Sequence, residues 1–287
     1  MDIVELYVMI DDFCKKFNPK YQKLLIKKKI ILRHRQKILN NSEIILIILL
    51  FPTSEYKCFK WFYINKIVKG EYREYFKNIP SYNRFIEYMP MGMLILSRLL
   101  GYIMYCNRRK TKNIYFIDST RIPICHNKRT NSHKTFASIA KIGKSTMGWF
   151  MGFKLHTVID TLGNLISVNI TSGNIDDRVP LLKLVKGITG KLFGDKGYIK
   201  KDLFKQLQEV GLMLITPLKK NMKSTLPIDM LDIIMSKKRV LIESVFNILK
   251  NKLQLCHTRH RSINNFCVHI LAVLTCYSCL KNKPKLS

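Results

Sequence analysis

Three acidic residues have the types and positions that two-metal phosphoryl-transfer chemistry requires. Asp118 follows the apolar run 114–117 and Asp195 follows the run 191–194, so both are expected at the ends of buried strands. Glu243 is expected one turn into a helix. Carboxylate oxygens are the ligands that Mg²⁺ prefers, and two ions about 4 Å apart can activate a nucleophile and stabilise a leaving oxygen. These acids are therefore candidate catalytic residues and metal ligands.

Each acid also has an ordinary structural interpretation. An Asp at a strand end is commonly a turn former or a helix cap, and a helical Glu near an Arg is commonly a surface ion pair. Arg239, Glu243 and Lys250 fall at helical offsets that share one face, which would place two cations beside one carboxylate. Such cations are candidate contacts for DNA phosphates. The residues alone leave the catalytic and the structural interpretation open.

The elements expected around these acids form a mixed α/β sheet. Strands are predicted at 114–117, 149–159, 165–171, 191–194 and 212–216, and helices at 178–186, 201–210 and 239–255. An antiparallel start followed by alternating helix and strand predicts a mixed sheet in which the first and fourth strands lie side by side. Residues 1–105 predict short helices, with a basic linker near 108–110. We expect a helical domain at 1–105, either DNA-binding or a plain helical packing domain, and a catalytic domain at 112–287.

Charge points to a polyanionic partner. The chain has 50 Lys and Arg against 19 Asp and Glu, a formal net charge of +31. The basic residues are spread through the chain, which favours a broad phosphate-binding surface on double-stranded DNA. An anionic membrane surface is the weaker alternative, because no long amphipathic apolar face accompanies the charge. The eight scattered cysteines predict reduced thiols and a cytoplasmic protein.

Several other residues have competing interpretations. Asp176 and Asp177 are expected to begin a helix rather than bind metal. His156 and Trp149 are expected in the core more than at the site, although Trp149 could stack on a nucleic-acid base. Four basic residues are candidate DNA contacts, with a solvated surface role as the alternative: Lys154, Lys196, Arg259 and Arg261.

Three segments together resemble the DDE transposases of bacterial insertion sequences. They are residues 117–120, residues 193–198 and the helix that carries Arg239, Glu243 and Lys250. The third resembles a Tyr-x2-Arg-x3-Glu-x6-Lys signature, except that Ser236 stands in the position of the Tyr. Residues 152–156, 172–174, 258–262, 265–266 and 277–278 resemble more narrowly the insertion-sequence 982 family. The resemblance runs from about Pro80 to the C-terminus.

The resemblance implies a ribonuclease H-like catalytic domain with two Mg²⁺ ions, or Mn²⁺ as a substitute, held by Asp118, Asp195 and Glu243. It implies cleavage of DNA at the terminal repeats of an insertion sequence and joining to target DNA, by a homodimer that brings two ends together. Two alternatives stay open. One is a nuclease of the same fold that does not join strands, and the other is an inactive DNA-binding protein derived from a transposase.

Overall fold

The computed structural model describes residues 2–27, 37–146, 148–217, 229–256 and 260–286, with backbone alone at residue 18 and residues 20–27. The chain divides into two compact units. Unit 1 contains Met1–Gly101 and Lys252–Lys281, and unit 2 contains Tyr102–Asn251 and Asn282–Ser287.

Unit 1 is helical. Its helices are α1 (Ile3–Lys27), α2 (Asn41–Leu50), α3 (Phe59–Phe62), α4 (Tyr82–Ile86), the first part of α5 (Met89–Arg108) and α10 (Ile263–Ser278), with a π-helical turn η1 (Tyr63–Val68) and a 3-10 turn η2 (Arg73–Tyr75). Asn40 caps α2, because its side chain accepts from the amide of Glu43 while Glu43 accepts from the amide of Asn40. The buried α2 packs against α10.

Helix α5 is long and apolar enough to cross a membrane by length and composition. Its buried residues recur at three- and four-residue spacing: Met89, Gly92, Ile95, Leu96, Leu99 and Leu100. That spacing is typical of a core helix with one apolar face. The last residues of α5 belong to unit 2, where Asn107 Nδ2 and Arg108 Nε donate to the carbonyls of Leu165 and Ile166 at 3.1 and 3.0 Å.

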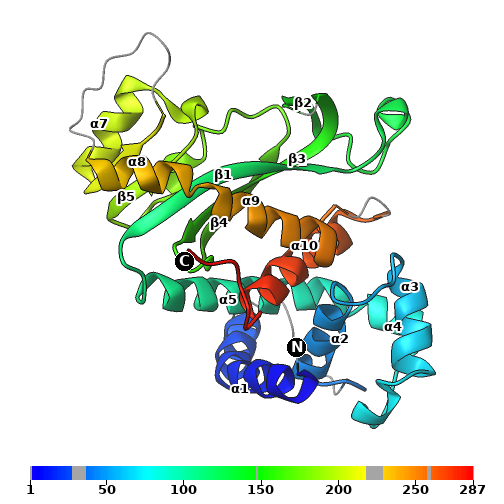
Figure 1. Cartoon of the computed structure of the whole chain (residues 1–287). Helices are drawn as coiled ribbons and strands as arrows, with labels where there is room; N and C mark the ends of the chain where they lie inside the picture. Colours follow the sequence, from blue (N-terminus) through cyan, green and yellow to red (C-terminus); the bar gives the residue numbers. More distant parts are fainter. Residues whose placement is uncertain (1, 28–36, 147, 218–228, 257–259, 287) are drawn as a thin grey trace. The chain divides into compact units, whose positions relative to one another are not determined.

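Unit 2 contains a six-stranded mixed sheet, which confirms the predicted fold class (Figure 1). The strands are β1 (Ile114–Pro123), β2 (Lys141–Ser145), β3 (Gly148–Asp160), β4 (Leu165–Ser172), β5 (Gly190–Phe193) and β6 (Leu212–Ile215). Their order is β2-β3-β1-β5-β6, with β4 also paired to β3. The pairing of β1 with β5 is parallel, so the first and fourth predicted strands are neighbours as expected.

One strand boundary was predicted wrongly and one strand was missed. The first strand does not end at Asp118 but continues to Pro123, because residues 115–123 pair in register with the long strand β3. Strand β2 was not predicted at all. Its exposed Lys and its buried Gly give no alternation of apolar and polar residues, and pairing with β3 specifies the strand instead.

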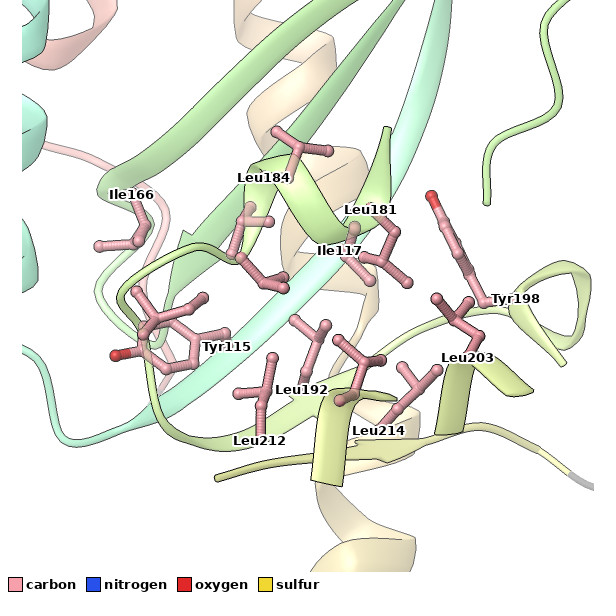
Figure 2. Close-up of a cluster of buried hydrophobic side chains, with 14 residues drawn as sticks. Tyr115, Ile117, Ile166, Leu181, Leu184, Leu192, Tyr198, Leu203, Leu212 and Leu214 are labelled. Carbon is pink, nitrogen blue, oxygen red and sulfur yellow. The ribbon is translucent and has the colours of Figure 1, made fainter. Parts of the chain in front are cut away.

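One face of the sheet is covered by short helices and by a compact apolar core (Figure 2). The helices are α6 (Leu181–Leu184) and α7 (Lys201–Glu209), and the core joins their leucines to strand residues such as Ile117, Val158 and Leu192. The predicted helix 178–186 is therefore much shorter than expected. It begins only after Pro180, which fits the first turn of a helix because it lacks an amide donor.

The predicted helix 239–255 is interrupted. Helix α8 (Met230–Lys237), which the sequence did not predict, is followed by α9 (Val240–Asn247) and then by a π-helical turn η5 (Ile248–Lys252). A π-helical turn changes the rotation per residue, so the common face predicted for Arg239, Glu243 and Lys250 does not continue past Asn247.

Candidate active site

Asp118 and Asp195 meet where the pairing of β1 with β5 ends. That pairing stops at Phe116 and Phe193. Each aspartate lies two residues further along its own chain, so parallel strands leave the two residues level with each other. Beyond this point the edge of β1 that faces the Asp195 segment has no paired strand. The topology therefore brings together two acids that are far apart in the sequence.

The environment of Asp118 is unfavourable for its charge. Burial raises the pKa of this carboxyl from 3.8 to about 6, and the negative charges of Asp195 and Asp177 act in the same direction. The amide of Ser119, which donates to Asp118 Oδ1 at 2.8 Å, and the guanidinium of Arg239 oppose this shift. Burial is the largest of these effects, so the metal-free site disfavours the charged form of Asp118.

Asp195 is more exposed and is held by two contacts. It begins the short turn η4 (Lys196–Tyr198), where its Oδ1 accepts from the amide of Lys196 at 2.7 Å. Arg239, at the start of α9, brings its Nη1 to 3.5 Å from the same oxygen. The guanidinium therefore links α9 to the strand end that carries Asp195.

Glu243 lies on α9, which packs against β1 through its buried face. Its own side chain is on the exposed side of the helix. In the part of the chain that the structure describes, no three His, Cys, Asp or Glu side chains are grouped to hold a metal ion. The structure therefore brings Asp118 and Asp195 together but does not bring Glu243 into contact with them.

A divalent cation nevertheless fits the two aspartates. The donors are hard carboxylate oxygens, and Asp118 is partly desolvated beside two other negative charges. A cation bound there would stabilise the charged form of the buried Asp118 carboxyl, so the chemistry of Asp118 and Asp195 suits Mg²⁺ or Mn²⁺.

A second charged cluster adjoins the first. Lys154 Nζ donates to Asp177 Oδ1 at 3.0 Å and to the carbonyl of Ile175 at 2.9 Å. His156 is fully buried, its Nε2 lies 2.8 Å from Thr171 Oγ1, and its Nδ1 lies 3.8 Å from Asp177 Oδ1. Burial lowers the pKa of His156 to about 4, so the imidazole is neutral near pH 7. Asp177 is thus held beside the acids of the site by a half-buried lysine.

Tyr198 separates the apolar core from these charges. Its ring belongs to the core, and in Figure 2 its hydroxyl points away from Leu203 and Leu214. That hydroxyl is buried and makes no hydrogen bond within the described residues. Burial and the charges of Asp118 and Asp177 raise the pKa of Tyr198 well above its ordinary value. The phenol therefore stays protonated and can donate a hydrogen bond into the site.

The comparison with known families decides the identity of this arrangement. A family model described as "Transposase DDE domain" matches residues 108–263, which is more than half of the chain. The chain belongs to the DDE transposase family. No curated protein and no solved structure matches the chain significantly.

Membership explains the fold and the acids together. The mixed sheet with its helices is the ribonuclease H-like architecture of a transposase DDE domain, as the sequence predicts. The family consists of polynucleotidyl-transfer enzymes that act on DNA and generally use divalent metals. The matched region includes Asp118, Asp195 and Glu243, whose individual roles in this DDE transposase stay predictions.

The residues predicted to contact DNA fall into three groups. Lys154 and Arg239 are engaged inside the DDE domain with Asp177 and Asp195, so a phosphate contact by either would require that ion pair to open. Lys196 is exposed beside Asp195, and Lys250 lies half-buried in η5. Arg261 is exposed in unit 1, and Arg259 lies outside the described residues.

Sequence reasoning underestimated Asp177 and assigned no role to Tyr198. Asp177 was expected to begin a helix, but α6 begins only at Leu181 and the carboxylate binds Lys154 instead. The signal for this contact is the two-residue spacing of Lys154 and His156, which places both on one face of a strand. Nothing in the sequence indicates that the hydroxyl of Tyr198 is left without a partner.

Proposed function

We propose that this protein is an active transposase that cuts DNA at the ends of its own insertion sequence and joins those ends to target DNA. The observation that carries the proposal is the meeting of Asp118 and Asp195 at the open edge of β1, in a chain of the DDE transposase family. We further propose that it is a member of the insertion-sequence 982 family and that it acts in the bacterial cytoplasm on the nucleoid. Its quoted sequence segments support that narrower assignment.

In this proposal Asp118, Asp195 and Glu243 are the catalytic residues and hold two Mg²⁺ ions, with α9 moving Glu243 toward the aspartates when DNA and metal bind. The bound ions would supply Lewis-acid charge at the scissile phosphate and favour ionisation of the attacking water. Water attack frees a 3′-hydroxyl at the element end, and this hydroxyl then attacks a phosphodiester of the target. The two reactions therefore use one set of residues.

The other residues of the site position the DNA and its charge. Arg239 would leave Asp195 and contact the phosphate, where its guanidinium can donate two hydrogen bonds. Lys250, Lys154 and Lys196 would contact backbone phosphates near the cut, and the protonated hydroxyl of Tyr198 would donate beside Asp118. These contacts provide alignment and charge stabilisation, which carry most of the catalysis in phosphoryl transfer.

Recognition of the element ends is assigned to residues 1–105, and the catalytic domain to 112–287. Arg259 and Arg261 would add phosphate contacts outside the catalytic centre. Two ends must be held together before joining, so we propose a homodimer in the working complex. The excess of 31 positive charges supports binding to double-stranded DNA of both the terminal repeats and the target.

The test is a joining reaction with the full chain. Purified protein is incubated with Mn²⁺, a fragment that carries the repeats flanking its gene, and a supercoiled target, beside the variants Asp195→Ala and Glu243→Gln. Metal-dependent joined products that both variants lose would support the proposal. Cleavage without joining would indicate a nuclease. Tight end binding without any cleaved or joined product would indicate an inactive DNA-binding protein.

A further inference from the structure

The hairpin formed by β2 and β3 carries an exposed tryptophan. The side chain of Trp149 is 59% exposed, although the sequence favoured a place in the core. Trp149 pairs across the hairpin with Lys144, whose Nζ lies 5.7 Å from the centre of the indole ring. Ile142, two residues from Lys144 on the same strand, is 51% exposed. Exposed apolar side chains that gather in this way mark a binding surface.

Two contacts hold the strands of the hairpin in place. Asn127 Nδ2 donates to the carbonyl of Trp149 at 2.9 Å, which ties the loop before β2 to the strand. Gly143 approaches Gly173 so closely that a Cβ at position 143 would lie 2.0 Å from the carbonyl oxygen of Gly173. The indole is therefore presented by a rigid element, so binding does not have to order it first.

The stretch of sequence around the tryptophan is basic and contains no acid. Residues 119–159 include seven Lys and Arg and no Asp or Glu. Five of these cations are exposed on β2 and on the preceding loop: Lys128, Arg129, Lys134, Lys141 and Lys144. Together with Ile142 and Trp149 they form what we call the hairpin surface. Its charge complements a polyanion.

The hairpin surface lies on the same side of the sheet as Asp118. Residues of β3 alternate between the two faces, so Trp149 and Thr157 share one face. Thr157 is the cross-strand partner of Asp118 in the antiparallel pair of β1 and β3. Eight residues of extended strand separate Trp149 from Thr157, which corresponds to about 26 Å. One DNA segment of roughly eight base pairs at ~3.4 Å each spans that distance.

We propose that the hairpin surface binds the DNA on which the site acts, with Trp149 stacked on an unpaired or terminal base about eight base pairs from the phosphate at Asp118. The cations of the surface would contact the backbone on either side. A stacking contact needs a free base face, which an intact duplex offers only at ends, gaps and unpaired nucleotides. The inference rests on the proposed function, because it assumes that DNA is the substrate.

The observations favour DNA over a protein or a lipid surface. A protein partner of comparable charge would need a dense run of acids, whereas DNA supplies regular phosphates together with flat bases that suit an indole. A lysine beside the ring adds a contact for a phosphate next to the stacked base. Binding to an anionic membrane would use the charge, but it would not distinguish paired from unpaired bases.

Tryptophan fluorescence gives a direct test, because the chain contains two tryptophans, Trp61 and Trp149. In the full-length variant Trp61→Phe, all tryptophan emission comes from Trp149. We expect emission to be quenched by a duplex with one unpaired nucleotide and much less by the same duplex fully paired. The matched control, Trp149→Phe, reports from Trp61 and should show no such difference between the two duplexes.

Binding measurements complete the test. Trp149→Ala should weaken binding of the duplex with the unpaired nucleotide by roughly 10-fold, and Trp149→Phe should recover part of that loss. The exposed lysine of α7 gives a control, Lys205→Ala, that should bind both duplexes like the wild type.

Four outcomes separate the hypotheses. Two results together would support the proposal. The duplex with the unpaired nucleotide quenches Trp149 emission, and its affinity rises from Ala to Phe to Trp at position 149. DNA binding measured by anisotropy with no change in Trp149 emission would overturn it and leave the proposed function intact. Quenching by anionic vesicles but not by DNA would also overturn it. Failure of the wild-type chain to bind any DNA would remove the proposed function as well.

Discussion

The two ends of β3 present opposite chemistry on one face of the sheet. At Thr157 the neighbouring strand carries Asp118, with Asp195 and Asp177 close enough to influence its charge. At Trp149 the strand carries an exposed indole beside Lys144, within a stretch free of acids. The difference teaches that charge is sorted along the strand. Carboxylates cluster at the Thr157 end, where a metal cation is proposed to bind. Cations cluster at the Trp149 end, where DNA phosphates are proposed to bind.

The two ends also differ in how their charges are balanced. The acidic end keeps internal cations, since Arg239 contacts Asp195 and Lys154 contacts Asp177. At the basic end, the sequence from Ser119 to Ile159 contains no Asp or Glu that could pair with the cations. At the acidic end these cations offset part of the negative charge without a ligand, whereas the basic end gains its compensation when a polyanion binds.

The largest effect is expected from neutralising the acidic end. Asp118→Asn and Asp195→Asn should each lower cleavage by on the order of 10³-fold or more, because in the proposed function each aspartate is a charged metal ligand of the reacting centre. Binding of end DNA, measured by anisotropy, should change little. Retained cleavage in either variant would show that the chemistry is located elsewhere.

A smaller effect is expected from Asp177, which acts through its neighbours. Asp177→Asn removes the charge that holds Lys154 beside the site, so cleavage should fall by roughly 10- to 100-fold. Asp176→Asn is the matched control, because Asp176 is more exposed and its carboxylate pairs with Arg178. Equal losses in both variants would argue against a specific role for Asp177. Cleavage rates with saturating DNA provide the measurement.

Stability should respond to pH at the acidic end. The folded metal-free protein holds the proton of Asp118 more tightly than the unfolded chain, because the pKa is raised from 3.8 to about 6. Its contribution to stability is therefore complete below about pH 3.8 and is lost as the pH rises through 6. Asp118→Asn should stabilise the protein by about 1 to 2 kcal/mol at pH 8, and by nothing near pH 3.5, after allowing for partial exposure. Urea unfolding with a chelator would measure the difference, and equal stabilities at pH 8 would contradict it.

The smallest effect belongs to a single cation of the basic end. Lys144→Ala should reduce the slope of log affinity against log salt by about 0.9 and leave the cleavage rate of bound DNA unchanged. Affinity titrations over a range of salt concentrations measure that slope. A variant with the wild-type slope would place the phosphate backbone away from the hairpin surface.

Sequence pattern predicted most of the sheet but fewer of its boundaries. Apolar runs located β3, β4, β5 and β6 because buried strands need continuous or alternating apolar residues. The extension of β1 past Asp118 and the strand β2 could not be read locally, since pairing with β3 specifies both. The π-helical turn after Asn247 also depends on tertiary packing, because helical spacing alone continues through it.

The candidate site could be predicted in part for a similar reason. Asp118 and Asp195 each follow an apolar run, so their meeting follows once two strands are assumed to be neighbours. Asp177 could not be placed in this way, because it lies in a loop whose course depends on Lys154. The exposure of Trp149 was also missed, since an aromatic residue in an apolar strand is usually buried.

The contact between Gly143 and Gly173 bears on how relatives of this chain should be compared. Two backbones touch there with no room for a side chain at position 143, so shape alone restricts that position to glycine. A glycine retained at position 143 across an alignment would therefore reflect the close packing of the hairpin against Gly173 and not a catalytic role. Variation at the neighbouring exposed positions of the hairpin surface would instead reflect differences in what relatives bind there.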